Sequence, residues 1–339
     1  MIMESDSSGD RTDRPTLQTI AGAAGVSTSL VSLALNGKSG VSAARRDEIR
    51  QLAEDLGYQP DPVARELRTG SVSMIGLLVR NVSNPFFNDL LAGMQQAAFE
   101  QGVTIVAMDS EYSEDRERRH IRHLAARRVD RLAIAPIGRA ASLEEWQRLR
   151  PDARTVLINA GPQMYPDLPH VAPDAQQAVG LAFDHLWQLG HRSIGFLSAP
   201  ISLMSDEDRY QHYLSLCDRR RIEPRPIFSD LQGEAIRNRI VTELQEPDPP
   251  TAVITNSDWS AHYVYLAVRD LGLRIGVDLS VVGHDDLDTS QLLEPALSTL
   301  AVDRRELGRQ IFARLGAADD SAFAGPVWLI ARASSGPPP

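Results

Sequence analysis

The sequence predicts an N-terminal all-α helix-turn-helix domain, followed by an α/β domain of two lobes in which helices flank parallel sheets. Three observations predict this fold class. Residues 16–37 contain two short apolar helical patterns joined by a turn with a glycine. From residue 72 onward, short apolar runs alternate with helical patterns. The chain has 339 residues, too many for one ordinary core, and this length predicts two or three domains.

The first helical pattern, in the stretch TLQTIAGAAGVSTSLVSLALNG, repeats apolar residues at helical spacing: Leu17, Ile20, Ala21 and Ala24. Gly25 interrupts this pattern, and Ser27 is suited to cap a second helix over residues 28–36. Gly37 ends the second helix. A plain two-helix hairpin shares this pattern, so the spacing alone leaves both interpretations open.

The chemistry of the second helix favours DNA binding. It begins with Thr28, Ser29 and Ser32, which are short, hydroxylated and poor helix formers. A helix whose N-terminal residues meet base edges in a major groove needs such side chains. Residues 14–50 are also basic in a chain of net charge −10, with Arg14, Lys38, Arg45, Arg46 and Arg50 against Asp47 and Glu48. A small basic DNA-binding domain attached to a larger acidic domain fits this charge distribution.

Composition indicates the cellular compartment in which we expect the protein. The single cysteine, Cys217, excludes an internal disulfide and fits a reducing cytoplasm. Residues 1–14 are polar and acidic without the apolar segment of a signal peptide, and we expect a disordered leader there. No run of 18 apolar residues occurs, so no membrane partner is expected.

The helix-turn-helix DNA-binding domain is expected over residues 15–58. A third helix follows Ser42 in this domain, and Gly57 ends that helix. In the next stretch, residues 59–71, Pro60 and Pro62 break regular structure. A helix over 63–67 would be too short to be stable alone, and a plain linker is the alternative.

The rest of the chain predicts two parallel sheets covered on both faces. The apolar runs lie at residues 74–79, 103–108, 132–136, 155–159, 193–198, 251–255, 279–284 and 327–331. Ligands of such sheets bind at the carboxyl ends of the strands, so two facing lobes predict a cleft. The sequence contains no glycine-rich nucleotide-phosphate motif and no GxSxG motif. We therefore expect no cofactor and no enzymatic activity.

Several residues after the predicted strands are candidates for ligand binding. Asn84 suits a turn, and Phe86 and Phe87 are predicted in a loop, one ring in the core and the other on a ligand. Asp258 either caps a helix or contacts a ligand, and Trp259 lies either on a helix surface or in a pocket wall. The segment 285–288 contains three aspartates but lacks the glycine and the distal glutamate of a calcium loop, so no metal is expected.

The chain resembles the lactose-repressor (LacI/GalR) family of transcriptional regulators in the phrases quoted above and in VSAARRDEI and LGYQPDPVARELRTG. The resemblance covers nearly the whole chain. It implies a cytoplasmic repressor that binds a palindromic operator in double-stranded DNA as a homodimer. It also implies a small-molecule effector in the cleft, with a sugar favoured over a purine or nucleoside. The alternatives are a regulator of this fold controlled by a protein partner or by no ligand, a solute-binding protein, and an enzyme.

The resemblance also implies a body like periplasmic sugar-binding proteins, with three crossovers between the lobes. The effector-binding and dimerisation domain is then expected at 72–335, with a tail at 336–339. Lobe 1 is expected at about 72–190 and 304–316, and lobe 2 at about 191–303 and 317–335. A hinge helix is expected to form on DNA, with Leu67 wedged into a base step and Ala64 and Arg65 near the floor of the minor groove.

The residues predicted to contact DNA are Thr16, Thr28, Ser29, Ser32, Leu33, Asn36, Lys38, Ala64, Arg65 and Leu67. Those predicted to bind the effector are Asn84, Phe86, Phe87, Arg209, Ser257, Asp258, Trp259 and Asp285, the last as the family's ligand-binding carboxylate.

The sequence departs from the family pattern at three positions. Leu33 replaces an arginine that reads guanine, Asp61 stands where asparagine is frequent, and His284 replaces an aromatic residue. The C-terminal segment has no leucine heptads, which predicts a dimer and not a tetramer.

Overall fold

The computed structural model describes residues 15–58, 74–138, 141–161, 165–200, 202–203, 207–317 and 320–339. The chain divides into two compact units, Met1–Gly70 and Ser71–Pro339. The expected leader at 1–14 and the expected hinge residues Ala64, Arg65 and Leu67 lie outside the described residues, as does Asp61.

The first unit contains three helices: α1 (Leu17–Ala24), α2 (Thr28–Leu35) and α3 (Ala43–Asp55). A hydroxyl caps each helix, because the side chains of Thr16, Ser27 and Ser42 accept a hydrogen bond from the backbone N–H three residues further on. Gly25 follows α1 with a φ of +63°, a conformation that suits glycine, and allows the sharp turn into α2. The helix axes of α1 and α2 differ by 104°.

A small core holds the first unit together. It consists of buried residues from all three helices: Ile20, Ala21, Val31, Ala34, Ile49 and Ala53. Two arginines of α3 add links between elements. Arg45 donates to the Ala24 carbonyl over 2.8 Å, and Arg46 donates to the Lys38 carbonyl over 3.0 Å. These two side chains therefore help to fix the turn between α1 and α2 and the segment after α2.

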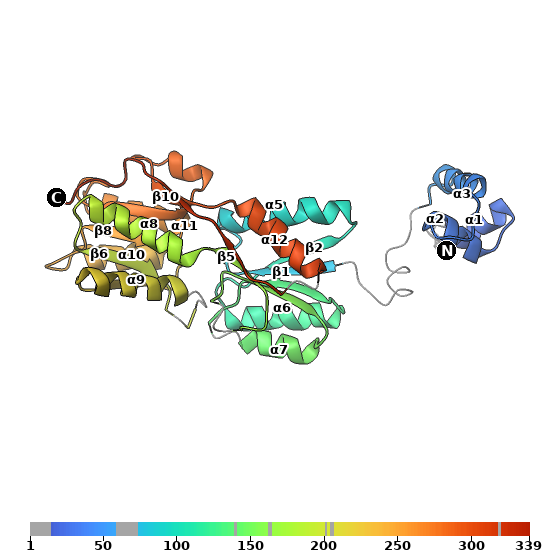
Figure 1. Ribbon diagram of the computed structural model, residues 1–339, viewed down its shortest axis with the longest axis horizontal. Helices are drawn as coiled ribbons and strands as arrows, with labels where there is room; N and C mark the ends of the chain where they lie inside the picture. Colours follow the sequence, from blue (N-terminus) through green and yellow to red (C-terminus); the bar gives the residue numbers. More distant parts are fainter. Residues whose placement is uncertain are drawn as a thin grey trace, which may run out of the picture. The chain divides into compact units, whose positions relative to one another are not determined.

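The second unit contains two six-stranded sheets, one in each lobe (Figure 1). The first sheet has the order β11-β5-β4-β3-β1-β2 and is parallel throughout. Its strands are β1 (Met74–Val79), β2 (Thr104–Asp109), β3 (Arg131–Ile134), β4 (Arg154–Ile158), β5 (His170–Pro173) and β11 (Phe323–Gly325).

The second sheet has the order β12-β10-β9-β8-β6-β7, and only β12, at its edge, runs antiparallel to its neighbour. Its strands are β6 (Ile194–Ser198), β7 (Arg225–Phe228), β8 (Ala252–Thr255), β9 (Ser280–Asp285), β10 (Ser298–Ala301) and β12 (Trp328–Ile330). The central strands are buried on both faces, as their continuous apolar runs predict.

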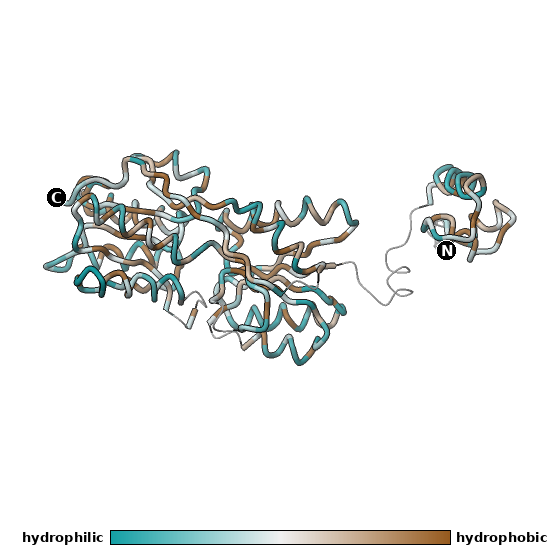
Figure 2. Tube along the Cα trace, in the orientation of Figure 1, coloured by the Kyte–Doolittle hydropathy of each residue, from teal (hydrophilic) through white to brown (hydrophobic). Residues whose placement is uncertain are grey.

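Helices cover both faces of each sheet. The first sheet packs between the pair α5 (Pro85–Glu100) and α12 (Arg304–Gly316) and the pair α6 (Glu114–Ala126) and α7 (Ala141–Leu149). The second packs between α8 (Ala175–Gln188) with α9 (Glu207–Arg220) and α10 (Gly233–Leu244) with α11 (Asp258–Asp270). A short 3-10 helix, η1 (Asp288–Gln291), follows β9. Figure 2 shows hydrophobic residues along the strands inside each lobe.

The lobe boundaries differ from the expected ones in two places. Helix α8 was expected in lobe 1, but its apolar face enters the core of lobe 2 through Ala178, Val179, Ala182, Phe183 and Leu186. Strand β11 was expected in lobe 2, but it pairs with β5 and completes the first sheet. Within the described residues the chain passes between the lobes three times, after β5, β10 and β11.

Helices α5 and α12 touch backbone to backbone. A Cβ atom on Gly308 would lie 2.1 Å from the Leu90 carbonyl oxygen, and one on Gly93 would lie 2.1 Å from the Arg305 carbonyl oxygen. Both positions therefore require glycine. This close approach fixes the N-terminal end of α12 on lobe 1, although the strand before it, β10, belongs to lobe 2.

None of the described helices alone has both the length and the apolar composition that a membrane span requires. Only α1 and α2 taken together do so, and they are bent by 104° at their junction.

Candidate functional site

The first candidate site is the polar surface of α2. Thr28 and Ser29, in its first turn, are exposed, as are Thr16 before α1 and Lys38 after α2. Asn36 lies at the C-terminal end of α2, and its side-chain amide donates to the Ser32 carbonyl over 2.6 Å. The predicted major-groove residues are therefore accessible on a folded helix.

Leu33 differs from these exposed polar residues because it is only partly exposed, as Ser32 also is. Its Cδ1 atom lies 3.9 Å from the position that a Cβ on Gly40 would take. The side chain thus packs toward the segment that follows α2 while part of it stays accessible.

The second candidate site is a cavity of about 310 Å³ in the second unit, lined by residues of both lobes. Its polar and aromatic lining consists of Arg80, Asn84, Phe86, Phe87, Tyr112, Asn159, His170, Asp174, Gln176, Asp208, Arg209, His212, Asn256, Ser257, His284, Asp285 and Phe323. Most of these residues follow a strand directly or belong to the first turns of the next helix, so the cavity lies at the carboxyl ends of both sheets.

The segment after β1 contributes an aromatic wall. Asn84 caps α5, because its side-chain oxygen accepts a hydrogen bond from the Phe86 N–H over 3.1 Å. Phe86 and Phe87 were expected in a loop but belong to the first turn of α5. Their ring centroids are 5.2 Å apart with an interplanar angle of 87°, and both rings are buried in the core of lobe 1 while also lining the cavity.

Each lobe supplies one arginine that holds the backbone of an asparagine. Arg80 donates from Nη2 to the Asn159 carbonyl over 2.8 Å in lobe 1, and Arg209 donates from Nη1 to the Asn256 carbonyl over 2.9 Å in lobe 2. The side-chain oxygens of both asparagines are buried, and neither has a hydrogen-bond partner among the described residues. Buried polar atoms are normally paired, so both oxygens are available to a ligand that donates hydrogen bonds.

Asp285 lies at the carboxyl end of β9 and is only 4% exposed. Its φ is +118°, and the φ of Asp286 is +50°, so two consecutive non-glycine residues have a strained backbone at the cavity. The Asp285 carboxylate lies 3.0 Å from Nδ1 of His284. A ring N–H on that nitrogen orients the carboxylate.

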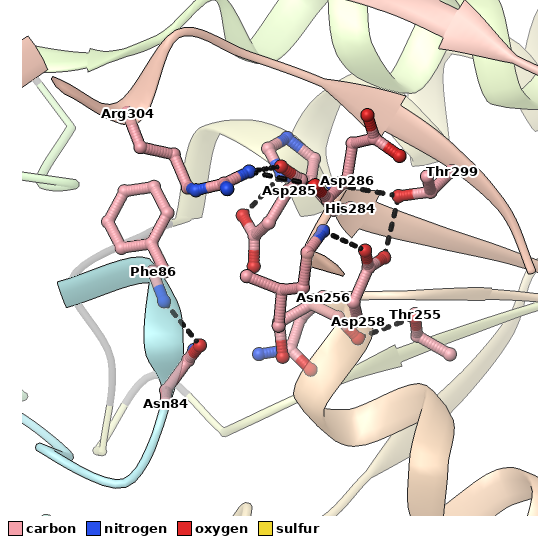
Figure 3. A network of polar contacts seen from close by, with 12 residues as sticks. Asn84, Phe86, Thr255, Asn256, Asp258, His284, Asp285, Asp286, Thr299 and Arg304 are labelled. Atoms are coloured by element: carbon pink, nitrogen blue, oxygen red, sulfur yellow. Dashed lines mark hydrogen bonds and ion pairs between the residues drawn. The ribbon is translucent and has the colours of Figure 1, made fainter. Parts of the chain in front are cut away.

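Asp258 does not line the cavity and is fully buried. It accepts hydrogen bonds from the Leu287 N–H, the Ser290 hydroxyl and the Thr299 hydroxyl, the first over 2.9 Å (Figure 3). Burial, followed by repulsion from Asp285, raises the pKa of Asp258 to about 7. This carboxyl group links α11, η1 and β10, which makes its contacts internal to lobe 2.

The cap of α11 also differs from expectation. Ser257, not Asp258, caps this helix, since its hydroxyl accepts from the Ser260 N–H over 3.1 Å. The Trp259 ring packs against Tyr263, with 5.6 Å between centroids.

Six of the eight predicted effector residues line the cavity: Asn84, Phe86, Phe87, Arg209, Ser257 and Asp285. Asp258 and Trp259 do not. Arg80, Asn159 and Asn256 also line the cavity but were not predicted, although each directly follows an apolar strand and could have been found by that position. No sequence pattern pointed to Phe323, which reaches the cavity from β11, far along the chain. In the described part of the chain, histidine, cysteine and acidic side chains do not form a group of three that could hold a metal ion.

Two family models match the chain. Residues 72–319 match periplasmic binding proteins and the sugar binding domain of the LacI family, and residues 16–61 match bacterial regulatory proteins of the lacI family. The chain is 30% identical over 301 residues to the HTH-type transcriptional repressor CytR of Escherichia coli strain K12, with 87% of each chain covered. It is 27% identical over 300 residues to the HTH-type transcriptional repressor PurR of Aliivibrio salmonicida, covering 87% of this chain and 89% of that protein.

Among solved structures, the chain is similar to the Lac repressor dimer bound to operator and the anti-inducer ONPF. The TM-score is 0.84 at 26% identity, and the match covers 96% of this chain and 100% of that one.

Proposed function

Because the chain belongs to the LacI family of bacterial regulatory proteins, we propose that it is a ligand-responsive repressor that binds a palindromic operator as a homodimer. One observation carries the proposal: both lobes line one cavity, in a chain that also contains a helix-turn-helix unit. The regulator acts in the cytoplasm, where its operator DNA is found.

The DNA-binding half of the proposal depends on α2. The exposed hydroxyls of Thr28 and Ser29 at the N-terminal end of this helix are suited to base edges in a major groove, and Lys38 is suited to a phosphate. A symmetric dimer presents two such helices to two half-sites. Contacts by Ala64, Arg65 and Leu67 in the minor groove stay a prediction.

The effector half of the proposal depends on the acceptors in the cavity. Asp285, Asn159 and Asn256 all present side-chain oxygens, and the two asparagine oxygens lack partners among the described residues. The cavity volume lies at the lower end of the range for ligand pockets, which favours a small ligand. A sugar carries several hydroxyl donors on a compact ring, so we favour a sugar over a purine or a nucleoside.

Effector binding would act through the arrangement of the lobes. A ligand that contacts both lobes favours the arrangement in which all its contacts form, and it shifts the population by its difference in affinity. The operator affinity then changes if the two arrangements differ in DNA binding.

A thermal-unfolding scan with neutral sugars, sugar phosphates, nucleosides and purines tests this proposal. A ligand at about 100 times its Kd stabilises the folded state by about 2.7 kcal/mol. For a domain of this size the midpoint then rises by about 5 to 10 °C. We expect a neutral sugar to give this shift, and operator binding with and without that sugar then gives the direction of the response.

Two variants make the scan specific to the cavity. Asp285→Asn removes the proposed carboxylate, and we expect it to reduce the shift. Asp288→Asn changes an exposed aspartate of the same segment that does not line the cavity, and the shift should be retained. If no compound stabilises the protein while operator binding is intact, the effector half of the proposal is wrong, and a regulator controlled by a protein partner or by no ligand is favoured.

A further inference from the structure

We propose that Arg304 is a positioning residue. It holds Asp285, and with it the carboxyl end of β9, in a fixed position relative to α5 of the other lobe. The inference deepens the proposed function and rests on it in one respect, since Asp285 is the proposed effector carboxylate. The contacts of Arg304 themselves do not depend on any ligand.

On the side of lobe 2, the guanidinium of Arg304 binds backbone oxygens. Its Nη1 atom donates to the Asp285 carbonyl, and it also donates to the Asp286 carbonyl over 2.9 Å (Figure 3). These are the two consecutive residues with positive φ, so the strained end of β9 is held by a charged donor.

On the side of lobe 1, the same guanidinium forms an ion pair with Asp89 of α5. The Nε atom donates to the carboxylate over 2.8 Å, and Nη2 lies 2.7 Å from the same oxygen. The planar, five-donor guanidinium can bind Asp89 on one edge and the two carbonyls on another, which a point charge could not do. The Arg304 side chain is 14% exposed, so solvent screens this link only partly.

The position of Arg304 in the fold makes the connection between β9 and α5 rigid. Arg304 is the first residue of α12, and α12 lies backbone to backbone on α5 through Gly93 and Gly308. The guanidinium therefore moves with lobe 1, while its two carbonyl acceptors move with β9. Any displacement of the end of β9 relative to α5 must stretch these hydrogen bonds or break them.

This arrangement gives effector binding a path to lobe 1. A ligand that pulls on Asp285 changes the position of the carbonyls that Arg304 holds. Arg304 passes the change to Asp89 and thus to α5, which directly follows β1. Strand β1 is the first described strand after residues 59–73, which join the two units of the chain.

Measuring the distance between the lobes tests the proposal without effector or operator. Spin labels on Gln147→Cys in α7 and Asn238→Cys in α10 report this distance by electron-electron double resonance in the full chain, with the labelled protein mixed into an excess of unlabelled protein so that each dimer holds at most one labelled chain. Both positions are exposed, one in each lobe, and the native Cys217 is buried. We expect one distance distribution for the labelled parent protein, and a broader or displaced one when Arg304→Gln is added.

Arg305 provides a matched control. Its Nε atom lies 3.7 Å from Asp89, but its side chain is 63% exposed, and this ion pair stays within lobe 1. Arg305→Gln should therefore leave the distance distribution unchanged. Asp89→Asn removes the anchor of Arg304 in lobe 1 and should reproduce the effect of Arg304→Gln, which keeps the test valid if one of the two variants fails to fold.

The double variant measures whether the two residues act together. If the link works as proposed, adding Asp89→Asn to Arg304→Gln changes the distribution little further, because the connection is already lost. The proposal is wrong if folded Arg304→Gln and Asp89→Asn proteins both give the parent distribution, or if Arg305→Gln broadens it equally. A flat effector panel would refute the proposed effector response but would leave these distances unaffected, so the two failures can be told apart.

Discussion

Leu33 is the residue of α2 whose chemistry departs most from its surroundings. The side chains predicted to read DNA around it are hydroxyls, an amide and an ammonium group, whereas Leu33 can only make apolar contacts. It is partly accessible and packs toward Gly40. A leucine cannot make the paired hydrogen bonds to guanine O6 and N7 that an arginine makes, so it is suited to a thymine methyl group instead.

Replacing Leu33 with arginine should therefore change operator preference. We expect Leu33→Arg to favour guanine at one symmetric position of each half-site, by about 1 to 3 kcal/mol. Selection from a random duplex library by the parent and the variant measures this change.

Lys38→Gln is the control for that selection. Loss of one phosphate contact per protomer should weaken binding about equally for all sequences, and it should reduce the slope of log affinity against log salt concentration by about 2 for the dimer. An unchanged half-site in the Leu33→Arg selection would show that Leu33 does not face a base.

At the scale of elements, α6 is tied to the rest of lobe 1 by a buried carboxyl group. Glu117 accepts hydrogen bonds from the Ile137 N–H, over 3.1 Å, and from the Ser142 hydroxyl. The group thus joins α6 to the segment after β3 and to α7. Burial is the main cause that raises the pKa of Glu117, to about 7.

The raised pKa of Glu117 predicts a pH dependence of stability. The folded state keeps the proton to a higher pH than the unfolded state, so the stabilising contribution is present in acid and is lost as pH rises from about 4.5 to about 7. Glu117→Gln should remove this part of the decline in unfolding free energy, which denaturant titrations between these pH values measure. Asp115→Asn, at an exposed position of the same helix, should keep the parent's dependence.

The contact between α5 and α12 gives a second prediction at this scale. Gly308→Ala should destabilise the protein by at least about 1 to 3 kcal/mol, because the new methyl group would meet the backbone of α5. Gly316→Ala, at the end of the same helix, places a methyl group where nothing lies within 4 Å and should be neutral or slightly stabilising. Equal unfolding midpoints for the two variants would contradict the close packing.

The elements also show what the sequence could predict. Long apolar runs such as those of β1 and β9 identified the central strands, and hydroxyl caps with glycine stops located α1 to α3. Strands β5, β7, β10 and β11 have no such signal, because they span three or four residues, and two of them contain proline. The lobe to which α8 belongs was also not readable, since its apolar face fits either core until the crossover is known.

The candidate site could be predicted where strand ends carry an unusual residue, as at Asn84 and Asp285. Effector binding by these residues stays a prediction. The pairing of Arg80 with Asn159, and the arrival of Phe323 from β11, depend on contacts between distant segments. Local patterns contain no information on such contacts. The same holds for Asp258, whose position beside a strand end suggested ligand binding while its three donors come from η1, β10 and the loop between β9 and η1.

At the scale of the whole molecule, the proposed symmetry fixes the number of chains. Two helices that read a palindrome require two copies of the protein. We expect sedimentation equilibrium at micromolar concentration to give twice the chain mass of 37.2 kDa, with or without DNA. A tetramer would contradict the prediction from the sequence, and a monomer would contradict the proposed mode of operator binding.

Because the chain passes between the lobes three times, the parts of the protein must also fold in a certain order during synthesis on the ribosome. Strand β11, which completes the first sheet, spans Phe323–Gly325, and β12, which completes the second, spans Trp328–Ile330. Neither sheet can close its edge until the last part of the chain has left the exit tunnel. The three-helix unit at the other end needs only the first 58 residues and can fold much earlier. A nascent chain can therefore contain a folded DNA-binding unit well before its two-lobed unit is complete.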